Sequence, residues 1–354
     1  MHDESLIRDL DLRERLEAAR GKALFSVERG MLISQQQRRD KEAVAAAEKA
    51  AALAALPRET RRRAIIREVF ENEPPSIRDL RHIHSVLAIC GLPYDRQPLD
   101  VRRYVKEQGQ MSLAVYAQDL PNAEGQLVPQ PLPYGPKARL ILMHLCSEAV
   151  RQKSATIELA DTFTAFVRDM GYDDAGGPRG SLTAFRQQLN ALAACTMRIT
   201  AWSGSTVKTK SFTPIEDFEL WLSADPRQRS LWPSTLTFSP TMYDSLQRHA
   251  LPVNVKAVRA FAGSARKLDL YFWLGYRLHN IERPLHISWN ALGEQFGEGF
   301  TRQRDFQRKF AMEVEHVREV FPKLPLRLTE DGITLHPADP KVLALPTPRP
   351  IKKA

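Results

Sequence analysis

The sequence predicts an α+β protein that is mainly helical, and three observations lead to this prediction. The N-terminal stretch is rich in Ala, Arg and Glu and has high helix propensity. After it, one order of elements occurs twice: helix, short strand, helix, turn, helix and β-hairpin. The last helix of each copy carries polar or basic residues at the spacings that point outward. This order is that of a winged helix, so we expect tandem winged-helix domains behind an N-terminal helical extension.

The N-terminal extension is predicted to cover residues 1–75. Residues 40–56 read as one helix that Pro57 ends, and residues 58–70 read as a second, shorter helix. Glu73-Pro74-Pro75 marks the boundary. The arginines at 61–63 suit either a DNA-contacting arm or a solvated helix, and the solvated helix is the preferred interpretation.

Composition limits the possible functions. The chain has 354 residues, 43% hydrophobic and 26% charged, which indicates a globular protein of two or three domains. No apolar run reaches the roughly 18 residues of a membrane helix, and the N-terminus lacks an apolar signal core. Three separated cysteines are expected to be buried thiols. The net charge of +9 favours an anionic partner, nucleic acid before a membrane surface, and we expect a cytoplasmic protein.

The first winged-helix domain is predicted at residues 76–225. Its early part carries short strands at 86–90 and 111–117. Next come the elements of the unit itself: a helix from Pro136 to about Lys153, a strand at 155–160, a helix capped by Asp161 and stopped by Gly171, a helix capped by Ser181, and a hairpin at 196–203 and 206–212.

The second winged-helix domain is predicted at residues 226–340, followed by a disordered basic tail at 341–354. A strand at 234–239 and a helix at 240–249 lead into it. Its elements are helices at 268–278, 290–296 and 302–320, a strand at 285–289, and a hairpin at 324–337 that turns at Asp331-Gly332.

Outward-facing donors form the candidate DNA-binding site, since Arg pairs with guanine and Asn or Gln with adenine in the major groove. Between residues 175 and 212 the chain has five basic residues and no acid. The lysines of the hairpin suit phosphate or minor-groove contacts. The candidate residues are Arg179, Thr183, Arg186, Gln187, Asn190, Lys208 and Lys210 in the first domain, and Arg302, Arg304, Arg308 and Lys309 in the second.

Enzyme chemistry is not indicated. The sequence has no GxxxxGK[ST], GxGxxG, HExxH or GxSxG motif. His82 and His84 have no further ligands at metal-binding spacing. Tyr104, Tyr243 and Tyr271 could act as DNA-nicking nucleophiles, but no histidine pair accompanies them. We therefore expect no catalytic residues, no cofactor and no metal.

Several motifs resemble the plasmid-encoded RepA family of replication initiators. A PYGPKAR opening at 133–139 leads into the first unit, which continues to a GGPRGSLTAFRQQLNAL segment at 176–192. LDLYFWLGYRL at 268–278 and ISWNALGEQFG at 287–297 resemble the family's later motifs. The resemblance covers roughly residues 80–340. It implies a protein that binds double-stranded DNA repeats at a plasmid origin, helps to open the duplex, and recruits host helicase and initiator proteins.

The resemblance further implies a cytoplasmic bacterial protein, a monomer–dimer equilibrium and repression of the protein's own promoter. The motif residues Tyr134, Gly135, Arg139, Trp273 and Arg277 are expected to be architectural. Tyr134 and Trp273 are placed in the core, and Arg277 is expected to pair with Asp269 or Glu282.

Other functions remain open from the sequence. A winged-helix transcriptional repressor without a replication role shares every feature described. A tyrosine-dependent nicking enzyme and an interaction protein that binds through its N-terminal helix are further alternatives.

Overall fold

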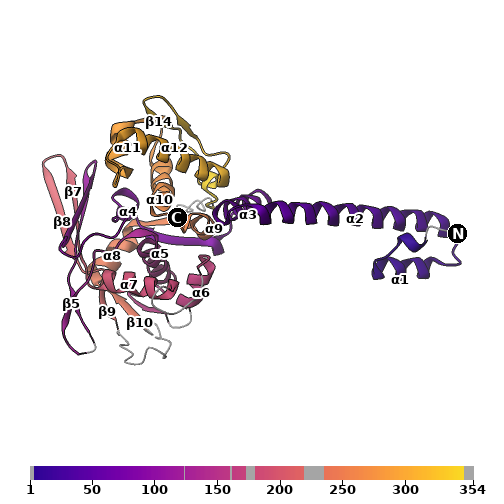
Figure 1. Ribbon diagram of the computed structural model, residues 1–354, viewed down its shortest axis with the longest axis horizontal. Coiled ribbons are helices and arrows are strands. Elements are labelled where there is room, and N and C mark those ends of the chain that lie inside the picture. The colour runs from indigo at the N-terminus through magenta and orange to yellow at the C-terminus, as the bar shows by residue number, and fades with distance from the viewer. Residues whose placement is uncertain (1–3, 123, 160–161, 173–179, 219–234, 347–354) are drawn as a thin grey trace, which may run out of the picture. The chain divides into compact units, whose positions relative to one another are not determined.

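The fold is described from a computed structural model, which covers residues 4–122, 124–159, 162–172, 180–218 and 235–346 (Figure 1). The chain divides into two compact units, Met1–Arg61 and Arg62–Ala354.

The smaller unit is a helical hairpin. It contains a 3₁₀ turn, η1 (Glu4–Leu6), and the helices α1 (Leu10–Ala19) and α2 (Phe25–Ala55) (Figure 1). Ile7, Leu12, Leu16 and Leu32 form its small core. The polar end of this core is closed by the buried Gln36, whose side-chain oxygen accepts from the backbone N–H of Arg8 and Asp9 at 3.0 and 2.9 Å. The predicted helix at 40–56 is therefore only the second half of a helix that begins at Phe25.

The larger unit begins within α3 (Arg58–Asn72) and has two halves. The first half contains η2 (Ile77–Asp79), β1 (Leu80–His84), α4 (Ser85–Ile89), β2 (Arg103–Gln108), β3 (Met111–Tyr116), β4 (Asp119–Pro121), β5 (Leu127–Pro129), α5 (Gly135–Gln152), β6 (Thr156–Glu158), α6 (Thr162–Asp169), α7 (Ser181–Ala193), β7 (Thr196–Ser203), β8 (Thr206–Phe212) and β9 (Ile215–Phe218). The second half contains β10 (Thr235–Phe238), α8 (Pro240–His249), β11 (Ala250–Asn254), α9 (Val255–Phe261), α10 (Ala265–Asn280), β12 (Leu285–Ser288), α11 (Trp289–Phe296), α12 (Gln303–Val320), β13 (Leu326–Leu328), β14 (Gly332–Leu335) and η3 (Pro340–Leu343).

The predicted element order is present twice. It runs α5–β6–α6–α7–β7–β8 in the first half and α10–β12–α11–α12–β13–β14 in the second. The strand pairing differs between the copies. In the second, β12 pairs with the hairpin strand β14, giving the order β12-β14-β13. In the first, the hairpin extends a sheet of order β2-β3-β7-β8, and β6 pairs with β10 instead.

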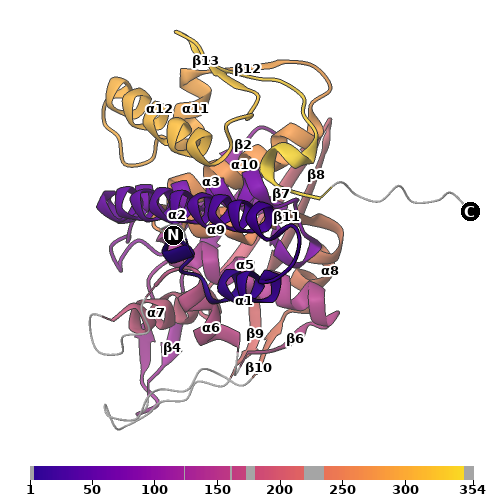
Figure 2. The same cartoon turned by 90° about the vertical axis from the view of Figure 1, so that its right-hand side faces the viewer.

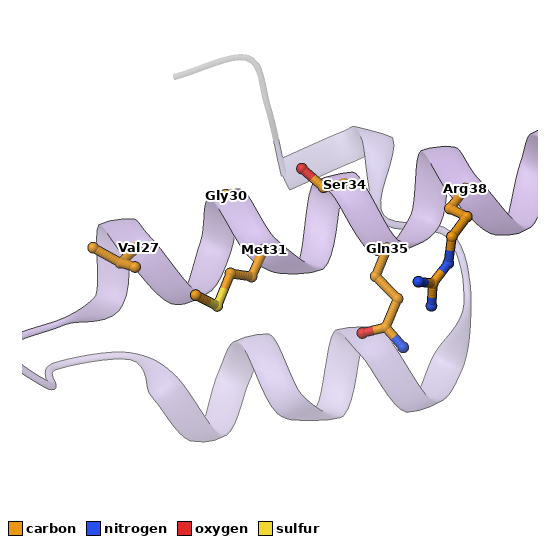
Figure 3. Close-up of a pocket in the computed structure, with 6 residues that line it drawn as sticks. All are labelled: Val27, Gly30, Met31, Ser34, Gln35 and Arg38. Atoms are coloured by element: carbon orange, nitrogen blue, oxygen red, sulfur yellow. The ribbon is translucent and has the colours of Figure 1, made fainter.

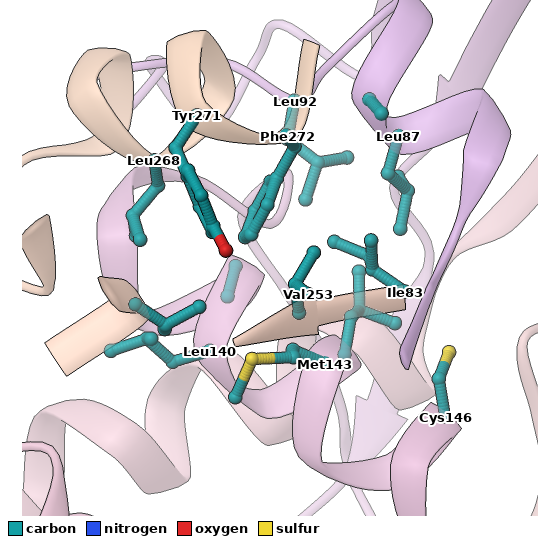
Figure 4. Close-up of a cluster of buried hydrophobic side chains, with 14 of the residues drawn as sticks. Ile83, Leu87, Leu92, Leu140, Met143, Cys146, Val253, Leu268, Tyr271 and Phe272 are labelled. Carbon is teal, nitrogen blue, oxygen red and sulfur yellow. The ribbon is translucent and has the colours of Figure 1, made fainter. Parts of the chain in front are cut away.

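One strand pair and one core join the two halves. β1 and β11 run antiparallel, and His82 lies opposite Pro252 at the centre of the pair. Each of these strands leads into a short helix capped by a side chain, because His84 accepts from Val86 N–H and Asn254 accepts from Lys256 N–H. Figure 4 shows how side chains from β1, α5, β11 and α10 meet in the core.

Two local predictions are wrong. Residues 86–90, predicted as a strand, belong to α4, since a short apolar run cannot distinguish a buried strand from a buried helix. Ser181 does not cap α7, because Gly180 occupies the N-cap position without a side-chain hydrogen bond. Asp161, the other predicted cap, lies outside the described residues.

The predicted domain limits also differ from the compact units. Residues 62–72, assigned to the extension, pack on the larger unit: Ile66 joins its core, Phe70 stacks on Phe321 with ring centroids 5.5 Å apart, and Arg63 pairs with Glu319. The predicted limit at 225/226 falls outside the described residues. The tail predicted as disordered from 341 is folded as far as Leu345, because Leu343 and Leu345 are buried in the core.

Candidate nucleic-acid interface

The helix α7 turns a polar face outward, as the sequence predicted. Phe185 and Leu189 are buried beneath it, whereas Arg186 and Gln187 are exposed. Thr183 and Asn190 are partly exposed at the edges of this face. The neighbouring Gln188 is buried instead, and its side-chain oxygen accepts from Tyr134 N–H at 2.8 Å. The four predicted residues of α7 therefore lie on one accessible side.

Contacts at the end of α6 position α7. Gly171 ends α6 with φ +77°, a conformation that favours glycine. The Arg62 guanidinium donates to the Gly171 carbonyl at 3.2 Å, and a Cβ at Gly171 would lie 2.5 Å from that guanidinium. Tyr172 meets the Phe185 ring edge-on and donates its hydroxyl to the Ala262 carbonyl. Arg179, predicted in the following loop, lies outside the described residues.

The hairpin β7–β8 carries its predicted lysines on an accessible surface. Lys208 pairs with Ala201 and Lys210 with Ile199 across the hairpin, and both lysines are exposed. On the other face, the Arg198 guanidinium lies 5.5 Å from the centre of the Tyr116 ring and donates to Ser211. The hairpin thus presents cations on both faces.

The helix α12 carries the basic set of the second half. Its apolar stripe is buried, and four cations lie exposed over its first two turns: Arg302, Arg304, Arg308 and Lys309. Arg308 contacts Asp305 at 3.4 Å, and most of the Arg308 side chain lies in solvent. This ion pair therefore contributes little to stability. Both views of the fold place α7 and α12 at opposite ends of the larger unit, with α5 and α10 between them (Figures 1 and 2).

Arg266 fixes the turn before α12, and sequence reasoning missed it. Its guanidinium donates to the carbonyls of Phe296 and Glu298 at 2.9 and 3.1 Å and lies 4.8 Å from the Phe300 ring. Gly297 lies within the same turn, where an added Cβ would stand 2.4 Å from the Gly293 carbonyl oxygen. Sequence reasoning missed this contact because Arg266 lies far from this turn along the chain.

A buried ion pair connects two of the sequence motifs. Arg139 on α5 contacts both carboxylate oxygens of Asp269 on α10 at 2.6 and 2.7 Å, and both residues are buried. The expectation that Arg277 pairs with Asp269 is therefore wrong. Arg277 lies instead 5.7 Å from the Trp273 ring, and within the described ranges it forms no ion pair, with Glu282 or otherwise.

The predicted burial of the other motif residues is confirmed only in part. Trp273 is buried, as predicted. Tyr134 is only partly buried, because it precedes α5 at the surface while Gly135 takes the buried position.

The second hairpin is acidic at its turn, unlike the first. Asp331 contacts His286 at 3.2 Å, and the Trp289 indole N–H donates to the Glu330 carbonyl at 3.0 Å. The turn of the second hairpin is therefore acidic, and the exposed cation Arg327 lies on its strand β13 rather than beside the turn.

The described part of the chain offers two depressions and three buried thiols as further candidate sites. No cluster of three or more His, Cys, Asp or Glu there could hold a metal ion. A depression of about 680 Å³ is lined by α2 alone, including Val27, Met31 and Arg38 (Figure 3). A second, of about 480 Å³, lies at the α11–α12 turn. Burial raises the pKa of each of the three free thiols to about 12, as expected for buried cysteines.

Two of the three tyrosines considered as nucleophiles, Tyr104 and Tyr271, make hydrogen bonds within the fold. Tyr271 is buried and its hydroxyl accepts from Asn254 N–H, while the Tyr104 hydroxyl donates to Glu298 at 2.9 Å. Burial raises the pKa of both hydroxyls. No helix among the described residues is both long enough and apolar enough to cross a membrane.

The fold and its surface define a mixed α/β protein with two exposed polar helices on one shared core. Residues 132–291 of the chain match the family described as plasmid encoded RepA protein. No curated protein matches the chain. Two crystal structures of domains 2 and 3 of RctB are similar to it. The first has 12% sequence identity and a TM-score of 0.43, and the match covers 68% of this chain and 87% of that one. The second has 10% sequence identity and a TM-score of 0.42, and the match covers 71% of this chain and 94% of that one.

Proposed function

We propose that the protein is a plasmid replication initiator that binds repeated double-stranded DNA sites at the plasmid origin. In this proposal it has no catalytic activity of its own. It helps to open the duplex, recruits host helicase and initiator proteins, and represses its own promoter. One observation carries the proposal: a chain whose residues 132–291 match the RepA family exposes polar and basic faces on the last helix of both copies of its repeated unit.

Two winged-helix units would bind DNA in the following way. Each last helix, α7 or α12, lies in a major groove with its exposed face against the base edges. Arg186 and Gln187 suit base recognition in the first groove, with Thr183 and Asn190 at its edge. The exposed cations of α12 suit phosphates and guanine in the second. With the helices in successive grooves on one side of the duplex, their sites are spaced by about one helical turn, roughly 34 Å.

The hairpins would contribute unequally. Lys208 and Lys210 are exposed cations and suit phosphate contacts beside the first groove. The acidic turn at Glu330 and Asp331 is repelled by phosphates, so the second hairpin stays away from the backbone. The net charge of +9 adds a sequence-independent attraction that weakens with salt.

The test is binding of the purified chain to DNA that flanks its own gene, with a footprint and a salt titration. We expect a footprint that repeats along the DNA and binding at least about 10³-fold tighter than to random DNA. Arg186→Ala should cost about 1–3 kcal/mol and relax specificity at one position. Lys323→Ala, which removes an exposed cation beyond the far end of α12, is the matched control and should change little.

A replication test of the same fragment separates the two DNA-binding functions. Maintenance of a plasmid that carries the fragment and the gene supports an initiator. Repression of the promoter without such maintenance assigns the repressor function instead. Equal affinity for all DNA sequences contradicts both.

A further inference from the structure

A large apolar pair stands at the end of the β7–β8 hairpin. Trp202 lies directly opposite Val207, two positions from the Gly204-Ser205 turn. Val207 is 56% exposed, and Trp202 is partly exposed. Trp202 N–H donates to the Gln110 carbonyl at 2.9 Å, so the neighbouring β2–β3 turn holds the strand in place while the two side chains face outward.

The surroundings of this pair are cationic. No acidic residue occurs from Thr196 to Phe212. Since side chains alternate along a strand, Lys208 and Lys210 lie on the face opposite Val207, and both are exposed. Arg198 lies on the same face as Trp202, four residues back along β7. A partner that fits this end of the sheet is therefore polyanionic and also offers an apolar slot.

Hairpin stability alone does not explain the pair. A cross-strand Trp–Val pair stabilises a hairpin, and this accounts for its geometry. It does not account for a Val left half in solvent next to Lys208 in the chain. The second hairpin shows the contrast, because it turns at Glu330 and Asp331 and is tied back by Trp289 and His286. The apolar tip belongs only to the hairpin that carries lysines.

We propose that Trp202 and Val207 form a wedge that enters the minor groove of duplex DNA and partly separates two neighbouring base pairs. Lys208 and Lys210 bind the flanking phosphates. This inference rests on the proposed DNA-binding function and adds to it a way of opening the duplex. Apolar side chains inserted at a base step unstack it and bend the duplex toward the major groove.

A wedge binds best where unstacking costs least. Separating a stacked step costs a few kcal/mol, and a mismatch lowers this cost. The wild-type chain should therefore prefer a duplex with a central mismatch. A protein that holds only the backbone has no such preference.

The experiment uses the full chain and two fluorescein-labelled 30-bp duplexes of one random sequence, one fully paired and one with a central two-base mismatch. We expect the wild type to bind the mismatched duplex about 10-fold tighter. Trp202→Thr keeps a residue of high strand propensity, and it should reduce the ratio to about one. Val207→Thr should lower the ratio by a few-fold. Trp202→Phe retains an aromatic wedge and should keep most of the preference.

Lys208→Ala is the control for charge. It should weaken binding to both duplexes equally and lower the salt slope by about one, leaving the ratio unchanged. Thermal unfolding of each variant, followed by circular dichroism, reports whether the fold is retained.

The outcomes distinguish the two proposals. A wild type that binds both duplexes equally, or a folded Trp202→Thr variant that keeps the wild-type ratio, overturns the wedge and leaves DNA binding intact. A wild type that binds neither duplex overturns the proposed function together with the wedge.

Discussion

Arg139→Met removes one partner of the buried ion pair and should make stability depend on pH in a defined way. In the wild type the Arg139 guanidinium makes two hydrogen bonds to Asp269 and three to the carbonyls of Leu92, Pro93 and Gly135. The variant leaves a buried carboxyl without its counter-charge. Breaking a buried pair from one side costs about 3–5 kcal/mol, because one charge stays uncompensated.

The magnitude follows from the protonation of Asp269. Without Arg139 the carboxyl is stable in the core only as the neutral acid, and its ordinary pKa is 3.8. Neutralising it costs about 1.4 kcal/mol for each pH unit above that value, so about 4.4 kcal/mol at pH 7 and about 1.6 at pH 5. A protein with a carboxyl whose pKa is raised in the folded state loses stability as pH rises. The free energy of unfolding of the variant should therefore be reduced more at pH 7 than at pH 5, by about 2.7 kcal/mol.

Urea unfolding followed by tryptophan fluorescence measures this difference, since all five tryptophans lie in the larger unit. The free energy of unfolding is compared with that of the wild type at each pH, so that other titrating groups cancel. A loss below 1 kcal/mol, or an equal loss at both pH values, would refute the reasoning. Asp269→Asn is the companion variant. It removes the titrating carboxyl, so its loss should not depend on pH.

Three further predictions concern the same unit. Gly297→Ala should destabilise the chain by more than about 2 kcal/mol in urea unfolding and weaken DNA binding, because the new Cβ would lie 2.4 Å from the Gly293 carbonyl; Gly275→Ala in α10, where an added Cβ has no neighbour within 4 Å, is the control and should cost far less. Burial lowers the pKa of His84 and His144 to about 4, so stability is fully present above pH 6.5 and should fall by up to about 3 kcal/mol for each as pH drops toward 4; a flat profile over this range in the wild type, or an unchanged profile in His144→Gln, would count against it. The three buried thiols should react with a thiol reagent only at the rate of unfolding, and rapid labelling of the native chain would contradict this.

Elements with strong local signals could be predicted from the sequence. The helices α5, α7, α10 and α12 and the hairpin β7–β8 combine apolar periodicity with clear turn residues, and the structure places them within a few residues of the predicted limits. The outward direction of Arg186 and Lys208 follows from the same periodicity. These features depend on residues that are neighbours along the chain.

Features that depend on long-range pairing were not predictable. β1 and β11 are five residues each and β11 contains Pro252, so only their mutual pairing makes them strands. The sheet partner of β6 is β10 rather than the nearby hairpin. Arg139 and Asp269 each belong to a recognisable motif, but nothing in either motif names the other as its partner. For the same reason, the sequence did not reveal that the two predicted domains share one core.

The central strand pair has a consequence for how such a protein can change. α7 and α12 present their polar residues in solvent, so single substitutions there leave the core untouched. The distance between the two helices is set elsewhere, by β1, β11 and the ion pair between α5 and α10. Altering that distance requires simultaneous changes at buried positions. We therefore expect relatives to diverge readily in the bases they contact, while the spacing between the two contacted sites stays the same.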